Sequence, residues 1–177
     1  MQKEVFITRV SRFLPNNPVS NEEMETYIGL IHENSSKSKS IVLRNNGIKC
    51  RYYALDKNGK ATHTNAQMAA LAVERLFEKN AAELKEVDLL CCGSSTPDQW
   101  MPSHAVMVHG WLKDSGDMEV VSPSGNCCSG MHALKYAWMA VKTGLSKKAV
   151  VAGSERASRI MNHQSFEEEA KKLAQAE

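Results

Sequence analysis

Hydrophobic and polar residues along this chain alternate between short apolar runs and longer segments with helical spacing. Short apolar runs bounded by turn-forming residues are typical of buried strands. The expected strands are residues 5–10, the run around Cys91 and Cys92, residues 119–122, and the apolar run that follows Lys148. Strands that alternate with helices predict a parallel or mixed sheet with helices on both faces. The predicted fold class is therefore α/β.

Capping signals mark the starts of two helices. Ser20 is followed three residues later by Glu23, which makes a capping box, and Thr64 begins a second helix in the same way. Each start is followed by apolar residues at helical spacing, which predicts one buried stripe per helix. The stripe residues are Met24, Tyr27, Ile28 and Ile31 in the first helix, and Met68, Leu71, Ala72, Leu76 and Phe77 in the second.

Two more helices and one loop complete the predicted pattern. One helix begins near Ser103, and another follows the strand at 119–122 and stops at Gly144. The apolar residues of this last helix are Met131, Leu134, Trp138 and Val141. Residues 33–40 are polar and low in complexity, so we expect an exposed loop there.

The strongest chemical signal is a thiol at the junction between a strand and a helix. Cys127 and Cys128 come directly before the helix that stops at Gly144. In the first turn of a helix, unpaired backbone N–H groups and the positive end of the helix dipole favour thiolate over thiol. A cysteine in that position is a candidate nucleophile near neutral pH.

The remaining cysteines point to no metal site. The chain has five cysteines, Cys50 and two adjacent pairs, and an odd count argues for reduced thiols rather than a disulfide framework. Adjacent residues on a strand point to opposite faces, so Cys91 and Cys92 are poorly placed to share one metal ion. We expect both to be small core residues of a buried strand.

The order of these features resembles the thiolase superfamily, and more narrowly the 3-oxoacyl-[acyl carrier protein] synthase III group. The residues that carry the resemblance are the stretch from Cys127 to Met131, the strand before it, and the stretch from Lys148 to Glu155 after the helix. From about Glu4 to Arg159 the segments follow the order of that family. The resemblance implies a thiolase-like fold, with this chain as one α/β half of the five-layered α/β/α/β/α architecture.

Two assignments of the nucleophile are open within this resemblance. The pattern Cys-x-Ser-Gly-Met selects Cys127, whereas the pattern Cys-Ala-Gly-Phe, more frequent in the synthase III group, selects Cys128 with Gly130. The spacing to Gly153 fits Cys127 without a gap. We therefore favour Cys127 as the catalytic residue, with Cys128 as the alternative.

The resemblance also implies substrate-binding positions. Arg44 lies in a segment that, in this family, is near the mouth of the tunnel for coenzyme A or the phosphopantetheine arm. Here an extra residue stands between Arg44 and Gly47, so the alternative is a solvated arginine on a loop. Trp100 and Met101 correspond to a loop near the acyl pocket and the dimer partner, and ordinary packing at an interface would explain them equally well.

Family enzymes have two similar halves, and the catalytic His and Asn lie in the second. We expect residues 1–160 to form an N-terminal thiolase-like half-domain and residues 161–177 a polar tail or short helix, with the C-terminal half absent. No residue of this chain inherits the roles of that His and Asn. The chain alone is therefore expected not to catalyse condensation.

The implied activity is that of an acyltransferase that forms an acyl-cysteine and condenses it with a malonyl thioester, as in fatty acid biosynthesis. Acyl-CoA and acyl carrier protein are the implied partners, their coenzyme A and phosphopantetheine thioesters are the substrates, and no metal or redox cofactor is implied. A homodimer, or pairing with a C-terminal half, is also implied. The alternatives are a noncatalytic partner subunit of a synthase, or a ketosynthase for specialised polyketides such as dialkylresorcinols or aryl polyenes.

Composition and charge change this picture little. An apolar content of 42% and a charged content of 24% suit a globular chain. A net charge of +2 gives no reason to expect nucleic acid or a membrane surface as a partner. No apolar run approaches the roughly 20 residues that span a bilayer, and the first residues lack the long apolar region of a signal peptide. We therefore expect a cytoplasmic protein.

Overall fold

The structure is a computed structural model that describes residues 4–30, 35 and 38–167. The chain divides into two compact units. The first, called here the sheet unit, comprises Met1–Phe13 and Thr64–Glu155. The second unit comprises Leu14–His63 and Arg156–Glu177.

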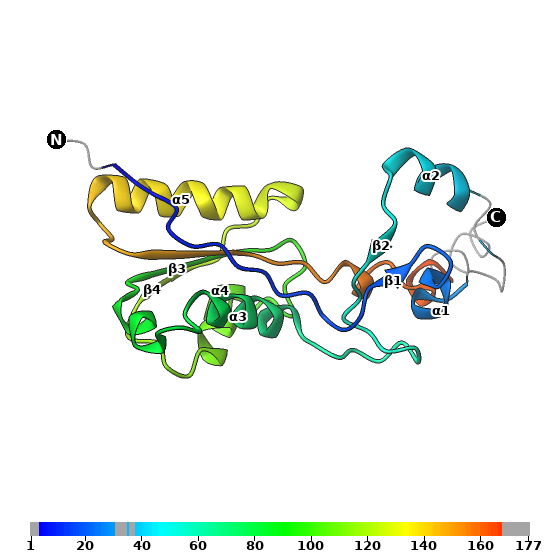
Figure 1. Cartoon of the computed structure of the whole chain (residues 1–177), viewed down its shortest axis with the longest axis horizontal. Coiled ribbons are helices and arrows are strands. Elements are labelled where there is room, and N and C mark those ends of the chain that lie inside the picture. The colour runs from blue at the N-terminus through cyan, green and yellow to red at the C-terminus, as the bar shows by residue number, and fades with distance from the viewer. Residues whose placement is uncertain (1–3, 31–34, 36–37, 168–177) are drawn as a thin grey trace. The chain divides into compact units, whose positions relative to one another are not determined.

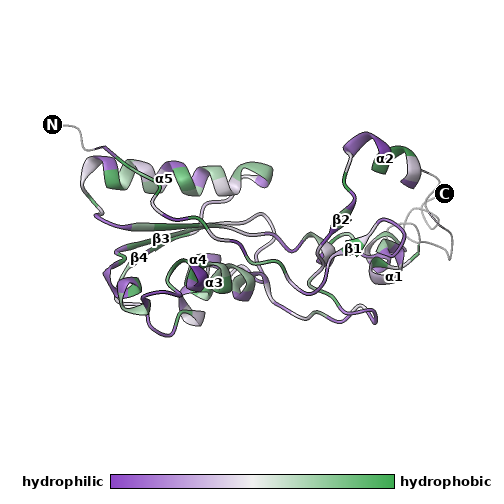
Figure 2. Cartoon of the chain, in the orientation of Figure 1, coloured by the Kyte–Doolittle hydropathy of each residue, from purple (hydrophilic) through white to green (hydrophobic). Residues whose placement is uncertain are grey.

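The sheet unit is built on a parallel three-stranded sheet. The central strand is β3 (Leu89–Gly93), which pairs with β4 (Glu119–Val121) on one side and β5 (Ala149–Gly153) on the other. The three strands consist mainly of apolar residues (Figure 2). These are three of the four predicted strands, and the parallel order agrees with the expected α/β class.

Helices cover both faces of this sheet (Figure 1). Helix α5 (Ser129–Thr143) lies on one face, and α3 (Asn65–Leu76) and α4 (His104–Trp111) lie on the other. A 3-10 helix, η1 (Ala81–Glu86), leads from α3 into β3. Gly144 ends α5 in the left-handed conformation (φ 83°), as predicted from the sequence.

The core of the sheet unit has two clusters because adjacent residues of β3 point to opposite faces. Leu90 and Cys92 belong to the cluster formed with α3 and α4, whereas Leu89 and Cys91 belong to the cluster formed with α5. All four are at most 1% exposed. Burying a large apolar side chain stabilises a fold by about 1.5–3 kcal/mol, so this strand anchors the unit.

Small residues form the buried face of α5 and about half of the buried face of α3. On α5 the core contacts come from Ala133, Ala137 and Ala140. On α3 the predicted stripe was partly wrong: Met68 and Phe77 are buried, but Leu71, Ala72 and Leu76 are only half-buried. Small side chains allow each helix backbone to approach the sheet closely. The other buried residues of α3 are Asn65, Ala66, Ala69, Ala70 and Val73.

The predicted strand at residues 5–10 was wrong, because the segment forms no strand in the structure. It has no ladder partner among the described residues, and Phe6, Ile7 and Val10 are more than 70% exposed. Side chains attach it to α3 instead: the Arg9 guanidinium donates to the Leu76 carbonyl at 3.2 Å, and the Ser11 hydroxyl donates to the Ala72 carbonyl at 2.6 Å.

The second unit has short elements and few buried residues. Strands β1 (Val19–Ser20) and β2 (Cys50–Arg51) pair antiparallel. The described helical elements are α1 (Met24–Ile28), α2 (Lys39–Asn46), the 3-10 helix η3 (Ala157–Arg159) and residues 163–167.

The capping box before α1 is confirmed by two reciprocal hydrogen bonds. The Glu23 N–H donates to the Ser20 hydroxyl at 3.3 Å, and the Ser20 N–H donates to the Glu23 carboxylate at 3.2 Å. The expected stripe on this helix is only half-buried, and Ile31 lies outside the described residues.

The predicted loop at 33–40 needs one correction, because α2 already begins at Lys39. Residues 33–34 and 36–37 of that loop lie outside the described part of the chain. Further on, residues 163–167 are helical and residues 168–177 are not described. None of the described helices is both long enough and apolar enough to cross a bilayer.

Candidate active site

Cys127 and Cys128 lie on a tight turn between β4 and α5. A short 3-10 helix, η2 (Asn126–Cys128), follows the strand, and α5 begins at Ser129. We call residues Asn126–Ser129 the cysteine turn. Both thiols are exposed to solvent and are next to the first N–H groups of a helix of 15 residues. The predicted placement of a thiol at a strand–helix junction is thereby confirmed.

The glycine at the end of β3 allows the cysteine turn to lie directly against the sheet. A Cβ atom on Gly93, the last residue of β3, would lie 2.2 Å from the Ser129 carbonyl oxygen, far inside van der Waals contact. Gly130 packs against Gly153, the last residue of β5, where a Cβ on Gly153 would lie in ordinary van der Waals contact, 3.5 Å from the Gly130 Cα. These contacts fix the height of the turn above the sheet.

Hydrogen bonds inside the cysteine turn hold its backbone. Asn126 has φ of 51°, a left-handed conformation that asparagine tolerates better than most residues. Its carbonyl accepts the Ser129 N–H and, at 2.8 Å, the Ser129 hydroxyl. The Ser129 side chain is itself buried, at 2% exposure. The turn is therefore ordered from within by the residue that begins α5.

A layer of buried polar groups lies next to the ends of β3 and β5. The Asn65 amide donates to the Ser94 hydroxyl at 2.8 Å, and the His104 Nε2 lies 2.9 Å from the Ser154 hydroxyl. Burial lowers the pKa of His104, and the nearby carboxylates of Asp98 and Glu155 partly oppose that shift. A neutral His104 is therefore a structural member of this layer.

Sequence patterns gave no role to Ser129, which ends the cysteine turn, or to Ser95 and Glu155, which lie next to it. Ser95 and Glu155 each follow a strand by two residues, and β3 and β5 are parallel neighbours in register Gly93 to Gly153. The carboxyl ends of parallel strands meet at one edge of a sheet, where ligand sites gather. The signal was thus present as polar residues directly after two apolar strands.

The other predicted site residues are Trp100, Met101 and Arg44. Trp100 and Met101 are on the loop after β3, with side chains 91% and 86% exposed. Arg44 lies in the last turn of α2 in the second unit and is exposed. Among the described residues, no hydrogen bond joins Trp100 or Met101 to the cysteine turn. His132 is also exposed, with its Nδ1 3.3 Å from the Ser124 carbonyl.

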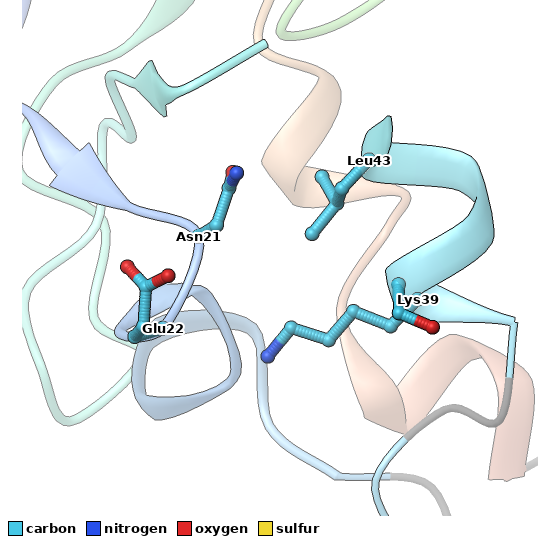
Figure 3. Close-up of a pocket in the computed structure, with 5 residues that line it drawn as sticks. Asn21, Glu22, Lys39 and Leu43 are labelled. Carbon is cyan, nitrogen blue, oxygen red and sulfur yellow. The ribbon is translucent and has the colours of Figure 1, made fainter. Parts of the chain in front are cut away.

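The second unit has a shallow pocket of about 370 Å³. Figure 3 shows Asn21 and Glu22 on one side of it and Lys39 and Leu43 on the other. The Lys39 ammonium is ion-paired with the Glu25 carboxylate at 2.8 Å. Opposite charges therefore meet around the pocket, so it does not select an anion or a cation by charge.

Metal ligands are not grouped in the described residues. Among residues 4–30, 35 and 38–167, no group of three or more His, Cys, Asp or Glu side chains is placed to hold a metal ion.

Sequence comparison finds curated relatives that share one name. The chain is 28% identical over 156 residues to beta-ketoacyl-[acyl-carrier-protein] synthase III of Neisseria meningitidis, covering 88% of this chain and 45% of that protein. It is 30% identical over 162 residues to the synthase III of Allorhizobium ampelinum, covering 88% and 44%. The chain thus spans less than half the length of these relatives. No family model matches it.

Solved structures show the same likeness. AbyA1, a tetronic acid condensing enzyme, matches 85% of this chain with a TM-score of 0.69 and 26% identity, over 45% of its own length. The synthase III of Thermus thermophilus matches 91% with a TM-score of 0.69 and 22% identity, over 46% of its length. The synthase III of Aquifex aeolicus matches 85% with a TM-score of 0.67 and 25% identity, over 44% of its length.

The fold and the position of the cysteine turn together define one α/β half of a thiolase-like condensing-enzyme fold. Within that class, the chain is homologous to the beta-ketoacyl-[acyl-carrier-protein] synthase III enzymes over less than half of their length. The resemblance inferred from the sequence is confirmed.

Proposed function

We propose that this chain provides the nucleophile-bearing half of an acyl-thioester condensing enzyme. The observation that supports this proposal best is the exposed cysteine turn at the start of α5, in a chain homologous to synthase III enzymes. A helix N-terminus stabilises a thiolate, which is the form of cysteine that attacks a thioester.

In the proposed reaction, the Cys127 thiolate attacks the carbonyl carbon of an acyl thioester. A new C–S bond to the cysteine forms, the C–S bond to coenzyme A breaks, and coenzyme A leaves as its thiolate, which takes up a proton. Backbone N–H groups at the cysteine turn would stabilise the oxyanion of the tetrahedral intermediate. Cys128 is the alternative nucleophile, because both thiols are exposed.

Condensation would then need groups that we assign to a second half of the fold. There a His and an Asn would assist decarboxylation of a malonyl thioester, and the resulting carbanion would attack the acyl-cysteine. Acyl-CoA and acyl carrier protein are the proposed partners in a cytoplasmic pathway such as fatty acid biosynthesis. Arg44 is proposed to bind the coenzyme A or phosphopantetheine arm, and Trp100 and Met101 to line the acyl pocket.

Two assays separate the steps of this proposal. Acyl transfer from acyl-CoA to the chain is expected and is measured as a mass increase on a cysteine-turn peptide. Malonyl-dependent formation of a 3-oxoacyl product by the chain alone is not expected, because the His and Asn are assigned elsewhere. A 3-oxoacyl product made by residues 1–177 alone would overturn that assignment. Acyl transfer to Cys127→Ser/Cys128→Ser at the unchanged rate would overturn the proposed nucleophile.

A second candidate function is a noncatalytic partner subunit, and the surface of α5 is the observation that favours some form of pairing. Met131, Leu134 and Trp138 are 63%, 37% and 49% exposed on this helix, with Val141 beside them. Contiguous apolar surface on a soluble domain marks an interaction site. We propose that this face packs against a second half or a second copy. A specialised polyketide ketosynthase is the remaining alternative, and assays with different acyl thioesters separate it.

Sedimentation velocity over a range of concentrations tests the pairing. The chain is expected to associate as its concentration rises, and Trp138→Ser should weaken that association. Leu145→Ser is the matched control, since Leu145 is 85% exposed but lies beyond the end of α5. A monomer at every concentration would contradict the proposal and show that the sheet unit is stable with this face in water.

A further inference from the structure

The cysteine turn is held from outside by a second polar group. Besides its bonds to Ser129, the Asn126 carbonyl accepts a hydrogen bond from the Ser95 hydroxyl. The Ser95 and Ser129 hydroxyls are 3.0 Å apart, so the two side chains and the Asn126 carbonyl form a closed group of three oxygens. Ser95 lies on the loop after β3, and it therefore connects that loop to the backbone that carries both thiols.

Glu155 in turn fixes Ser95 and its neighbour. One carboxylate oxygen accepts the Ser95 N–H at 2.6 Å, and the other accepts the Thr96 hydroxyl at 2.5 Å. Hydrogen bonds to an ionised carboxylate are stronger than those between neutral groups. The parallel register places Ser95 and Glu155 side by side, each two residues beyond the paired Gly93 and Gly153.

We propose that Glu155 is a positioning residue for the cysteine turn. Its carboxylate, acting through Ser95, holds the Asn126 carbonyl and so fixes the backbone on which Cys127 and Cys128 approach the start of α5. This inference rests on the proposed function only in treating the cysteine turn as the reactive site. Glu155 touches neither substrate nor thiol in this role.

The charge of Glu155 and its positioning role predict opposite effects on the thiols. A nearby negative charge disfavours a thiolate, so simple removal of the charge would speed thiol alkylation. A loosened turn would instead separate the thiols from the N–H groups at the start of α5 and slow alkylation. The sign of the change therefore separates the two roles.

The experiment measures alkylation of each cysteine by iodoacetamide near neutral pH, with peptides identified by mass spectrometry. Cys50 is exposed in the second unit and serves as the internal reference for reagent and pH. Glu155→Gln and Ser95→Ala should each slow labelling of the cysteine turn about threefold relative to Cys50, the scale of one helix-terminus interaction. Ser95→Thr keeps the hydroxyl and should keep the rate.

The connection from Glu155 through Ser95 to Asn126, called here the relay, also predicts that the effects of Glu155→Gln and Ser95→Ala on labelling are not additive. Because Glu155 acts through Ser95, the double variant E155Q/S95A should label at the rate of S95A alone. Glu86→Gln is the matched control, since Glu86 is also an exposed carboxylate. Glu86 is ion-paired at 2.6 Å with Lys148, which comes directly before β5, at the end of that strand far from Glu155. Glu86→Gln should leave the labelling rate unchanged. The thermal midpoint of each variant is measured in parallel to separate turn effects from unfolding.

Faster labelling in Glu155→Gln, unchanged labelling, or additive effects in the double variant would each overturn the proposal. These outcomes are independent of acyl transfer, because alkylation needs no substrate site. If acyl transfer fails while the relay holds, the proposed function fails and this inference stands. If acyl transfer succeeds while Glu155→Gln labels like the parent chain, this inference fails alone.

Discussion

Cys91 and Cys92 lie in the middle strand of the sheet, whereas Cys127 and Cys128 lie on the turn that leads into α5. The two pairs have the same Cys-Cys sequence but differ in exposure to solvent and in backbone surroundings. The first pair is 0% exposed, and burial raises the pKa of Cys91 to about 11 and raises that of Cys92 as well. The second pair is exposed at the start of a helix. The comparison teaches that backbone placement, rather than residue type, decides which thiols can react.

The largest expected difference between the pairs is their rate of alkylation. In the folded chain, Cys91 and Cys92 become accessible only when β3 opens, which costs several kcal/mol. We expect them to label at least about a thousandfold more slowly than Cys127, Cys128 and Cys50. Time-resolved mass spectrometry with iodoacetamide measures all five in one sample, and urea-unfolded chain is the control. Equal rates for Cys91 and Cys50 in the folded chain would contradict the placement of β3.

Substitution of Gly93 should break the close contact between β3 and the cysteine turn. Gly93→Ala would place a Cβ only 2.2 Å from the Ser129 carbonyl oxygen, so the turn or the strand must move. Overpacking of this kind should lower the free energy of unfolding by about 2–3 kcal/mol in urea titrations and should also slow labelling of the cysteine turn.

Gly110→Ala is the matched control for that substitution. A Cβ on Gly110 meets nothing within 4 Å in α4, and alanine favours a helix over glycine. This variant should be unchanged or more stable by about 0.5–1 kcal/mol. If Gly93→Ala behaved like Gly110→Ala, the close contact between sheet and turn would not exist in solution.

Alkaline pH should sharpen the contrast through the buried pair. The folded-state pKa of Cys91 is raised above its unfolded value, so the chain is more stable while the thiol is protonated and loses that stability as pH rises toward about 11. We expect a loss of about 1 kcal/mol per thiol for each pH unit above about 9. Urea titrations at increasing pH measure it, and C91A/C92A should give a flatter profile. An equal slope in that variant would show that other groups cause the loss.

Acid should produce a smaller effect through His104. Burial depresses its folded-state pKa, so the unfolded chain takes up the proton first, and stability is lost as pH falls below about 6.5. For a single group the loss cannot exceed about 1.4 kcal/mol per pH unit. His104→Leu should remove this dependence, and His132→Gln, at an exposed site, should retain it. If thermal midpoints kept this pH dependence in His104→Leu and lost it in His132→Gln, the titrating histidine would not be His104.

Sequence alone predicted the parts of this structure that depend on local pattern. The apolar run around Cys91, the thiol before α5 and the stop at Gly144 follow from side-chain periodicity and helix termini, and the structure confirms them. Residues 5–10 show the limit, because an apolar pattern cannot supply the neighbouring strand that would pair with it.

The support of the cysteine turn also escaped prediction for a physical reason. Ser95 and Glu155 are 60 residues apart and meet only because β3 and β5 are parallel neighbours in a specific register. Nothing in the local sequence around either residue specifies that register. The alanine face of α5 was missed similarly, since helical spacing marks the larger residues Leu134 and Trp138 more strongly than Ala133 or Ala137.

Mapping of the acylated residue tests the central claim most directly. The chain is exposed to a limiting amount of acyl-CoA, or of a thiol-directed inhibitor, and digested, and the adduct is located by mass spectrometry in the parent chain, Cys127→Ser and Cys128→Ser. The account predicts an adduct on Cys127 that Cys127→Ser abolishes. An adduct on Cys128 that persists in Cys127→Ser would move the nucleophile by one residue. An adduct on Cys50, Cys91 or Cys92, with the cysteine turn unmodified, would contradict the claim that this turn is the reactive site.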